Sequence, residues 1–155
     1  MRLNFALVLL LAAVLSGCVG APEAAPTQTT PAAKTTAQVA SAVAKTKPQL
    51  ESAMARFDER KCLVVMELGS SDGAKTMACV EALRDMAAHS RIMQKDLNEA
   101  QPWPEETRAL AEETVLRLGN MMEAANYGDG KSMTVTTSAM EFLRSQLHGW
   151  KPYGA

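Results

Sequence analysis

Apolar residues recur at every third or fourth position between Pro48 and His148, and this spacing constrains the fold more than any other feature of the sequence. Such a period places apolar side chains on one face of an α helix, whereas a strand places them at every second position. Period-two alternation is almost absent from the same stretch. The sequence therefore predicts an all-α domain.

Turn signals divide this stretch into four helices. Pro48 suits a first helical turn, where its missing N–H costs nothing, and Gly69 ends that helix. Asp72 is a candidate N-cap for the second helix, and Glu105 suits the first turn of the third. We expect helices over residues 48–68, 73–100, 105–125 and 132–148, and a short one over 39–45. Because the connections are short, we predict an up-down-up-down four-helix bundle.

The apolar positions also predict which face of each helix points inward. The stripe of the first helix is interrupted by Lys61 and comprises Leu50, Met54, Phe57, Val64 and Leu68. The stripe of the second comprises Cys79, Leu83, Met86, Ser90, Met93 and Leu97. In the fourth helix either Val135 or Thr136 faces inward, together with Met140, Leu143 and Leu147.

The N-terminus is shaped like an export signal. Arg2 precedes an apolar run over residues 5–15, which is shorter than the roughly 20 residues that span a bilayer stably. Leu15-Ser16-Gly17-Cys18 resembles the lipobox of bacterial lipoproteins. That resemblance implies that residues 1–17 are removed as a signal peptide and that lipid, including palmitate, is attached to Cys18. An ordinary signal peptide that happens to meet a cysteine is the alternative.

Residues 18–36 are expected to form a flexible stalk, and residues 37–155 the helical domain. The stalk is rich in Ala, Pro and Thr and has too little apolar surface to offset the entropy of ordering. Val19 stands where, in lipoproteins, an aspartate implies retention in the inner membrane. We therefore expect the periplasmic leaflet of the outer membrane in a double-membrane bacterium, or the outer face of the cell in a single-membrane one. The net charge of −1, with both signs interspersed, disfavours nucleic acid as a partner.

Export also favours a disulfide between Cys62 and Cys79 over a metal or redox pair. Cys62 lies eight residues before Ser70, and Cys79 lies eight residues after Ser71. An antiparallel hairpin would place both cysteines at the same height. A bond there would close a loop of about 15 residues and stabilise the fold by about 3 kcal/mol.

Recognised catalytic motifs are missing from the sequence, which contains no G-x-S-x-G, H-E-x-x-H, C-x-x-C-H or P-loop pattern. The paired carboxylates at 105–106 and 112–113 are typical of a solvated helix face, because adjacent residues on a helix do not face each other. His89 is interpreted as structural or surface-exposed. We therefore expect a protein that is not an enzyme.

One arrangement predicts a cofactor site. In the expected bundle, the start of the first helix and the end of the fourth lie at one end, so Met54 and His148 can both reach inward there. A thioether and an imidazole are an axial pair that haem iron accepts. Each residue also has an ordinary interpretation, since methionines commonly fill cores and a terminal histidine commonly interacts with the helix dipole.

The domain resembles cytochrome b562, a soluble four-helix haem carrier. Leu50-Glu51-Ser52-Ala53-Met54 is similar to that family's opening L-E-x-x-M, and Ala125-Asn126-Tyr127-Gly128 is similar to its A-N-x-G turn. Arg144-x-x-x-His148 is similar to its terminal arginine and histidine. The resemblance implies haem b bound by Met54 and His148, with Arg144 near the propionates, and a role in electron transfer. The cysteine pair, the lipobox and the Gly149-Trp150 interruption depart from the family.

The alternative function is that of a haem-free lipoprotein that acts through protein contact, as an immunity, exclusion or envelope-assembly factor. Trp103, Trp150 and Tyr153 could anchor such an interface, because these residue types dominate interface hot spots. Trp103, between two prolines, could equally plug a loop. Copper binding by the methionines is a weaker alternative, because only Met121 and Met122 are adjacent and the others are scattered along the core stripes.

Overall fold

The structure is a computed structural model that describes residues 32, 34–126 and 133–155. These residues belong to the second of two compact units, Pro31–Ala155. The predicted signal peptide, Cys18 and most of the predicted stalk lie outside the described residues, as do Tyr127 and Gly128 of the A-N-x-G sequence. The described part is all-α, as predicted, and contains no strand. Its elements are α1 (Thr36–Ala44), α2 (Lys47–Glu59), α3 (Cys62–Glu67), α4 (Gly73–Glu99), α5 (Glu105–Asn126), α6 (Met133–His148) and the 3-10 helix η2 (Lys151–Tyr153).

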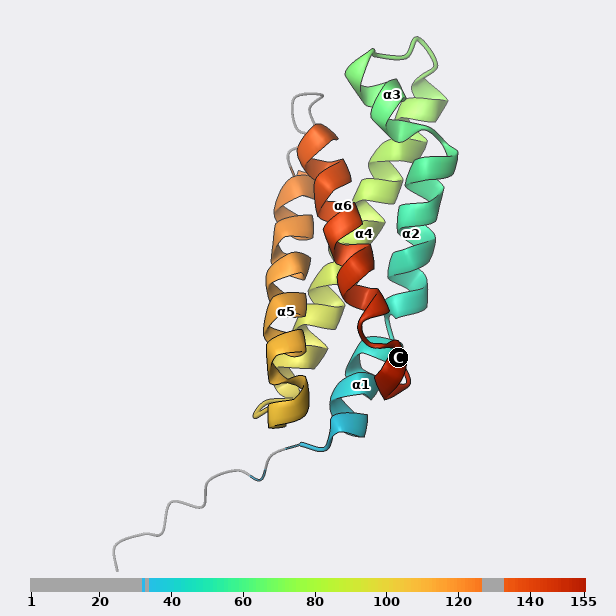
Figure 1. The fold of residues 1–155 in the computed structure, drawn as a ribbon. Helices are drawn as coiled ribbons and strands as arrows, with labels where there is room; N and C mark the ends of the chain where they lie inside the picture. Colours follow the sequence, from blue (N-terminus) through green and yellow to red (C-terminus); the bar gives the residue numbers. More distant parts are fainter. Residues whose placement is uncertain (1–31, 33, 127–132) are drawn as a thin grey trace, which may run out of the picture. The chain divides into compact units, whose positions relative to one another are not determined.

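Four longer helices, α2, α4, α5 and α6, run alongside one another and enclose the core (Figure 1). The largest interfaces join α4 to α5, α5 to α6, and α2 to α4. The short helices α1 and α3 lie at opposite ends of this group (Figure 1). None of the described helices has the length and apolar character needed to cross a membrane.

The core is rich in methionine, and its members come from all four longer helices. Six methionine side chains are almost completely inaccessible to solvent: Met54, Met86, Met93, Met121, Met133 and Met140. Unbranched, polarisable methionine side chains fill irregular gaps between helices. These residues therefore pack as hydrophobic filler along the helix faces.

The inward face predicted for α4 is confirmed at every position. Cys79, Leu83, Met86, Ser90, Met93 and Leu97 are all buried. Asp72 caps this helix as predicted, because its carboxylate accepts hydrogen bonds from the backbone N–H groups of Ala74 and Lys75 at 3.1 and 3.3 Å. In α6 the open choice is resolved: Thr136 is buried, whereas Val135 is 57% exposed.

The continuous first helix expected over residues 48–68 is wrong. Helix α2 ends at Glu59, and Lys61 adopts a left-handed conformation with φ of 52°, after which α3 begins in a new direction. The change of direction keeps Cys62 inside, but it leaves Val64 50% exposed and Leu68 81% exposed. The break falls at Lys61, the residue that interrupts the apolar stripe of the sequence.

A disulfide joins the two cysteines of this hairpin, as predicted. The Cys62 and Cys79 sulfurs are bonded, their Cα atoms are 5.4 Å apart, and both residues are fully buried. The sequence separation of 17 residues corresponds to a chain-entropy stabilisation of about 3 kcal/mol. The bond fixes α3 against α4 next to the positive-φ residue.

Helix α1 is well capped and begins one residue before the predicted domain boundary at 37. Thr35 and Gln38 form a capping box, in which each side chain accepts a hydrogen bond from the other residue's backbone N–H. Val39 and Val43 are fully buried. Outside the helix, the N–H of Lys34 donates to the Pro102 carbonyl at 3.2 Å, so α1 is tied to the connection between α4 and α5.

Candidate functional site

Met54 lies on α2, and its side chain is completely buried in the core. It belongs to the same inward stripe as Leu50 and Phe57, which are also buried. Its thioether is therefore a packing group surrounded by protein. An iron ligand at this position would need space for a porphyrin on one side of the sulfur.

His148 is the last residue of α6 and is exposed to solvent. Its neighbours in the chain, Leu147 and Trp150, are the residues that turn inward, and both are fully buried. The expectation that His148 reaches inward is therefore wrong in this structure. The helical period places position 147 on the core side of α6, and the imidazole one residue later points away from it.

Arg144 joins two helices at the surface. Its Nη2 donates to Oδ2 of Asp58 on α2 at 2.5 Å, and both side chains are more than a third exposed. A pair this exposed contributes at most about 1 kcal/mol to stability. Arg144 thus has a carboxylate partner within the protein, instead of being held free for an anionic ligand.

A buried polar network occupies the end of the molecule where α6 meets the C-terminal tail. The Trp150 indole Nε1–H donates to Oγ1 of Thr114 on α5 at 2.9 Å, and the Gln146 amide donates to the same oxygen at 3.3 Å. The Thr114 hydroxyl donates to the Leu110 carbonyl at 2.7 Å. The indole N–H, the Gln146 amide and the Thr114 hydroxyl all have hydrogen-bond partners in this network, so the indole is buried without an unsatisfied N–H.

Gly149 leaves the space in which the C-terminal tail turns toward the core of the domain. A Cβ at this position would lie 3.0 Å from Cδ1 of Leu110 and 3.2 Å from the Gln146 carbonyl oxygen. The chain then continues into η2, where the Tyr153 ring meets the Trp150 ring edge-to-face at 6.0 Å between centroids. Of the three predicted interface anchors, Trp150 is completely buried and is not accessible to a partner. Tyr153 packs on it and stays partly exposed, and the half-buried Trp103 donates to the Leu97 carbonyl at 2.8 Å.

The positions of the three predicted haem-binding residues can be compared with what a haem requires. Met54 is enclosed in the core, His148 points to solvent, and Arg144 is paired with Asp58. The side chain that fills the core beside His148 is the indole of Trp150. The residues as arranged do not fit an axial pair, and the sequence resemblance alone supports haem binding. Within the described residues, no cluster of three or more His, Cys, Asp or Glu side chains could hold a metal ion.

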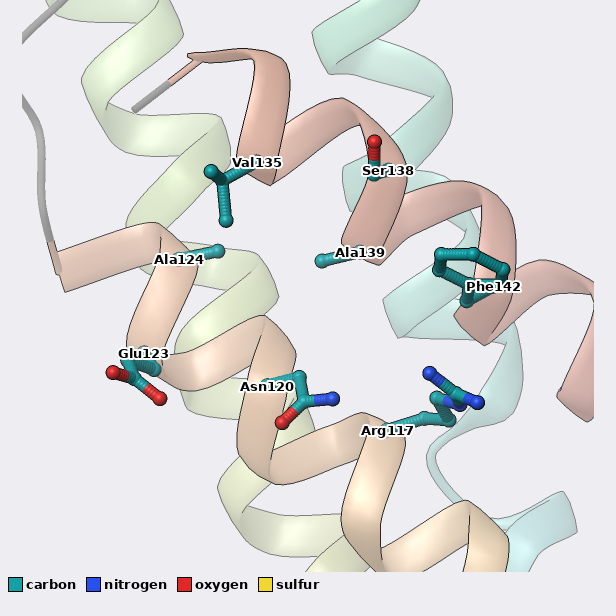
Figure 2. Close-up of a pocket in the computed structure, with 8 residues that line it drawn as sticks. All are labelled: Arg117, Asn120, Glu123, Ala124, Val135, Ser138, Ala139 and Phe142. Atoms are coloured by element: carbon teal, nitrogen blue, oxygen red, sulfur yellow. The ribbon is translucent and has the colours of Figure 1, made fainter. Parts of the chain in front are cut away.

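A groove lies between α5 and α6 on the surface of the described residues. It has a volume of about 330 Å³ and is open to solvent. Figure 2 shows Ala124 and Arg117 on one wall, and Val135, Ala139 and Phe142 on the other. Phe142 and Val135 are 55% and 57% exposed, although both are large and apolar. This groove was not predicted from the sequence, because Phe142 lies outside the apolar stripe that was expected to face inward on the last helix.

Arg117 and Phe142 lie opposite each other at one end of this groove (Figure 2). Its guanidinium carbon lies 4.8 Å from the centroid of the Phe142 ring, and its Nη2 lies 2.5 Å from Oε1 of Glu113 one turn earlier. The carboxylate and the aromatic face hold the guanidinium across the gap between α5 and α6. The groove therefore presents an exposed aromatic ring in contact with a guanidinium, and its lining contains both apolar and polar side chains.

Comparisons with known proteins add no identification: no family model matches the chain, and no curated protein or solved structure matches it.

We predict that Thr114→Val destabilises the protein by about 1–3 kcal/mol, because the substitution keeps the side-chain volume but leaves the buried Trp150 N–H without an acceptor. The measurement is urea denaturation of the variant and of Thr134→Val, an exposed α6 control that is expected to stay within about 0.5 kcal/mol of wild type. Adding Trp150→Phe removes the unpaired N–H donor. The double variant should therefore lose less stability than the sum of the losses in the two single variants. Strict additivity would show that the hydrogen bond does not contribute.

We also predict that added haemin gives no Soret band that depends on Met54 or His148. Met54→Leu removes the thioether at nearly constant volume, and His148→Gln removes the imidazole from an exposed position. The absorbance spectra of both variants with haemin should match that of wild type. A band in the wild-type spectrum that either substitution abolishes would contradict the fit described above and establish haem ligation.

Proposed function

We propose that the chain is a lipid-anchored protein of the bacterial cell envelope that acts by binding another protein through the groove between α5 and α6. In this proposal Cys18 carries the lipid, residues 18–36 are the stalk, and the domain is an up-down four-helix bundle built from α2, α4, α5 and α6. The protein works through contact and carries out no chemical step of its own.

The observation that supports this proposal is the exposed Phe142 ring in the groove, which Arg117 contacts. A large aromatic side chain that stays more than half exposed beside a second exposed apolar residue, Val135, is unusual on a helix that otherwise buries its apolar face. Covering the exposed half of Phe142 would contribute about 2 kcal/mol to an association. Arg117 contacts the ring through a cation–π interaction, which contributes about 0.5–1 kcal/mol at an exposed position.

The anchor is supported by the lipobox resemblance alone, and it has a direct test. We predict that Cys18→Ser moves the protein from the membrane fraction to the soluble fraction and abolishes incorporation of labelled palmitate. Cell fractionation with immunoblotting measures the first effect, and autoradiography the second. A Cys18→Ser protein that remains in the membrane and still carries label would exclude lipid attachment at this residue.

The contact surface is tested by site-specific photo-crosslinking in cells. A photoreactive phenylalanine analogue replaces Phe142 in one strain and Glu141, which is exposed on α6 outside the groove, in another. We predict a discrete crosslinked product from position 142 and none from position 141, because only the first lies against the partner. The same products from both positions, or none from position 142, would argue against the groove as the contact surface.

A further inference from the structure

A second groove lies at the end of the molecule where α2, α3 and the start of α4 meet, and we call it the tip groove. Its volume is about 590 Å³. The floor is apolar and is formed by Val64 and Val65 of α3 together with Ala74 and Ala78 of α4. Val64 is 50% exposed there, so the floor is accessible to a ligand.

The rim of the tip groove carries more positive than negative charge. Three cations, Arg60, Lys61 and Lys75, line it with one carboxylate, Glu59. Lys75 lies 3.6 Å from Oδ2 of Asp72 and is compensated. Arg60 donates to the neutral Ala78 carbonyl at 2.9 Å. Among residues 34–126 and 133–155, neither Arg60 nor Lys61 forms an ion pair with an acidic side chain.

The backbone holds this rim in a fixed geometry. Lys61 has φ of 52° and ψ of 43°, a left-handed conformation that costs a residue with a side chain on the order of 1 kcal/mol. A glycine would adopt the same conformation without that cost, but it would bring no charge to the rim. The next residue, Cys62, is bonded to Cys79, so the disulfide fixes the α3 and α4 walls before any ligand arrives.

We propose that the tip groove binds an acidic peptide segment of a partner protein, with an apolar side chain on the Val64–Ala78 floor and carboxylates paired with Arg60 and Lys61. Charge complementarity selects the ligand, because an occupant of the apolar floor comes within reach of two cations that lack acidic partners. The groove lies at the α3 end, opposite the α1 end at which the N-terminal segment joins the domain (Figure 1).

The test uses the full-length chain in phosphatidylcholine nanodiscs and two fluorescein-labelled peptides. One peptide alternates leucine with glutamate, and the other alternates leucine with glutamine. Fluorescence anisotropy should show the acidic peptide binding about tenfold more tightly than its amide counterpart, with the difference shrinking as salt screens the exposed charges. Reducing the Cys62–Cys79 bond should weaken binding of the acidic peptide, because the walls are then no longer fixed.

Three variants locate the binding site on the protein. Arg60→Gln combined with Lys61→Gln should lower affinity for the acidic peptide about tenfold. Val64→Asp should lower it as well, by removing an apolar floor contact and adding repulsion at an exposed position that folding does not depend on. Lys151→Gln, which removes an exposed cation in η2, should leave the affinity unchanged. Thermal melts of each variant confirm that the fold is kept.

Several outcomes would overturn the proposal. These are no binding of the acidic peptide, equal binding of both peptides, or wild-type affinity in the Arg60→Gln/Lys61→Gln variant. Binding to phosphatidylglycerol vesicles that requires Arg60 and Lys61, without peptide binding, would assign the groove to anionic lipid instead. Because Phe142 lies on α6, its crosslinking is independent of the tip groove, so failure here leaves the α5–α6 contact standing.

Discussion

The hydrogen bond from Trp150 to Thr114 determines how the C-terminal tail packs against this domain. It lets the largest side chain of the tail enter the core with its one polar atom satisfied. Once the indole is inside, the tail folds back as η2 and packs on it through Tyr153. The end of the molecule that the sequence resemblance assigned to a haem is thereby filled by the chain's own residues, and His148 points outward.

Helical periodicity predicted most of the fold because helix burial repeats regularly. All six positions predicted to face inward on α4 are buried, and the capping role of Asp72 was visible in its position before an apolar run. The expectation of export and the spacing together predicted the Cys62–Cys79 bond, since two residues equidistant from a turn meet in an antiparallel hairpin. These features depend on local sequence and on distance from a turn.

The errors arose where one residue changes the direction of the chain. Lys61 adopts a positive φ that few non-glycine residues adopt, so nothing in the apolar pattern beyond the interruption itself indicated that α2 stops there. Likewise, a one-residue difference in helical phase decides whether Leu147 or His148 faces the core. The candidate site was predicted less well than the fold, because Phe142 and Arg117 meet across two helices whose rotation the sequence does not specify.

The distribution of methionines has a consequence for oxidative damage. Six thioethers are sealed inside the domain, where peroxide cannot reach them, whereas Met77 near the beginning of α4 is 53% exposed. An oxidant would convert the exposed Met77 before these six, turning a flexible apolar group into a polar sulfoxide while the interior stays intact. Chemical ageing of this protein would therefore begin at the disulfide-bonded end and leave the packing of the long helices unaltered.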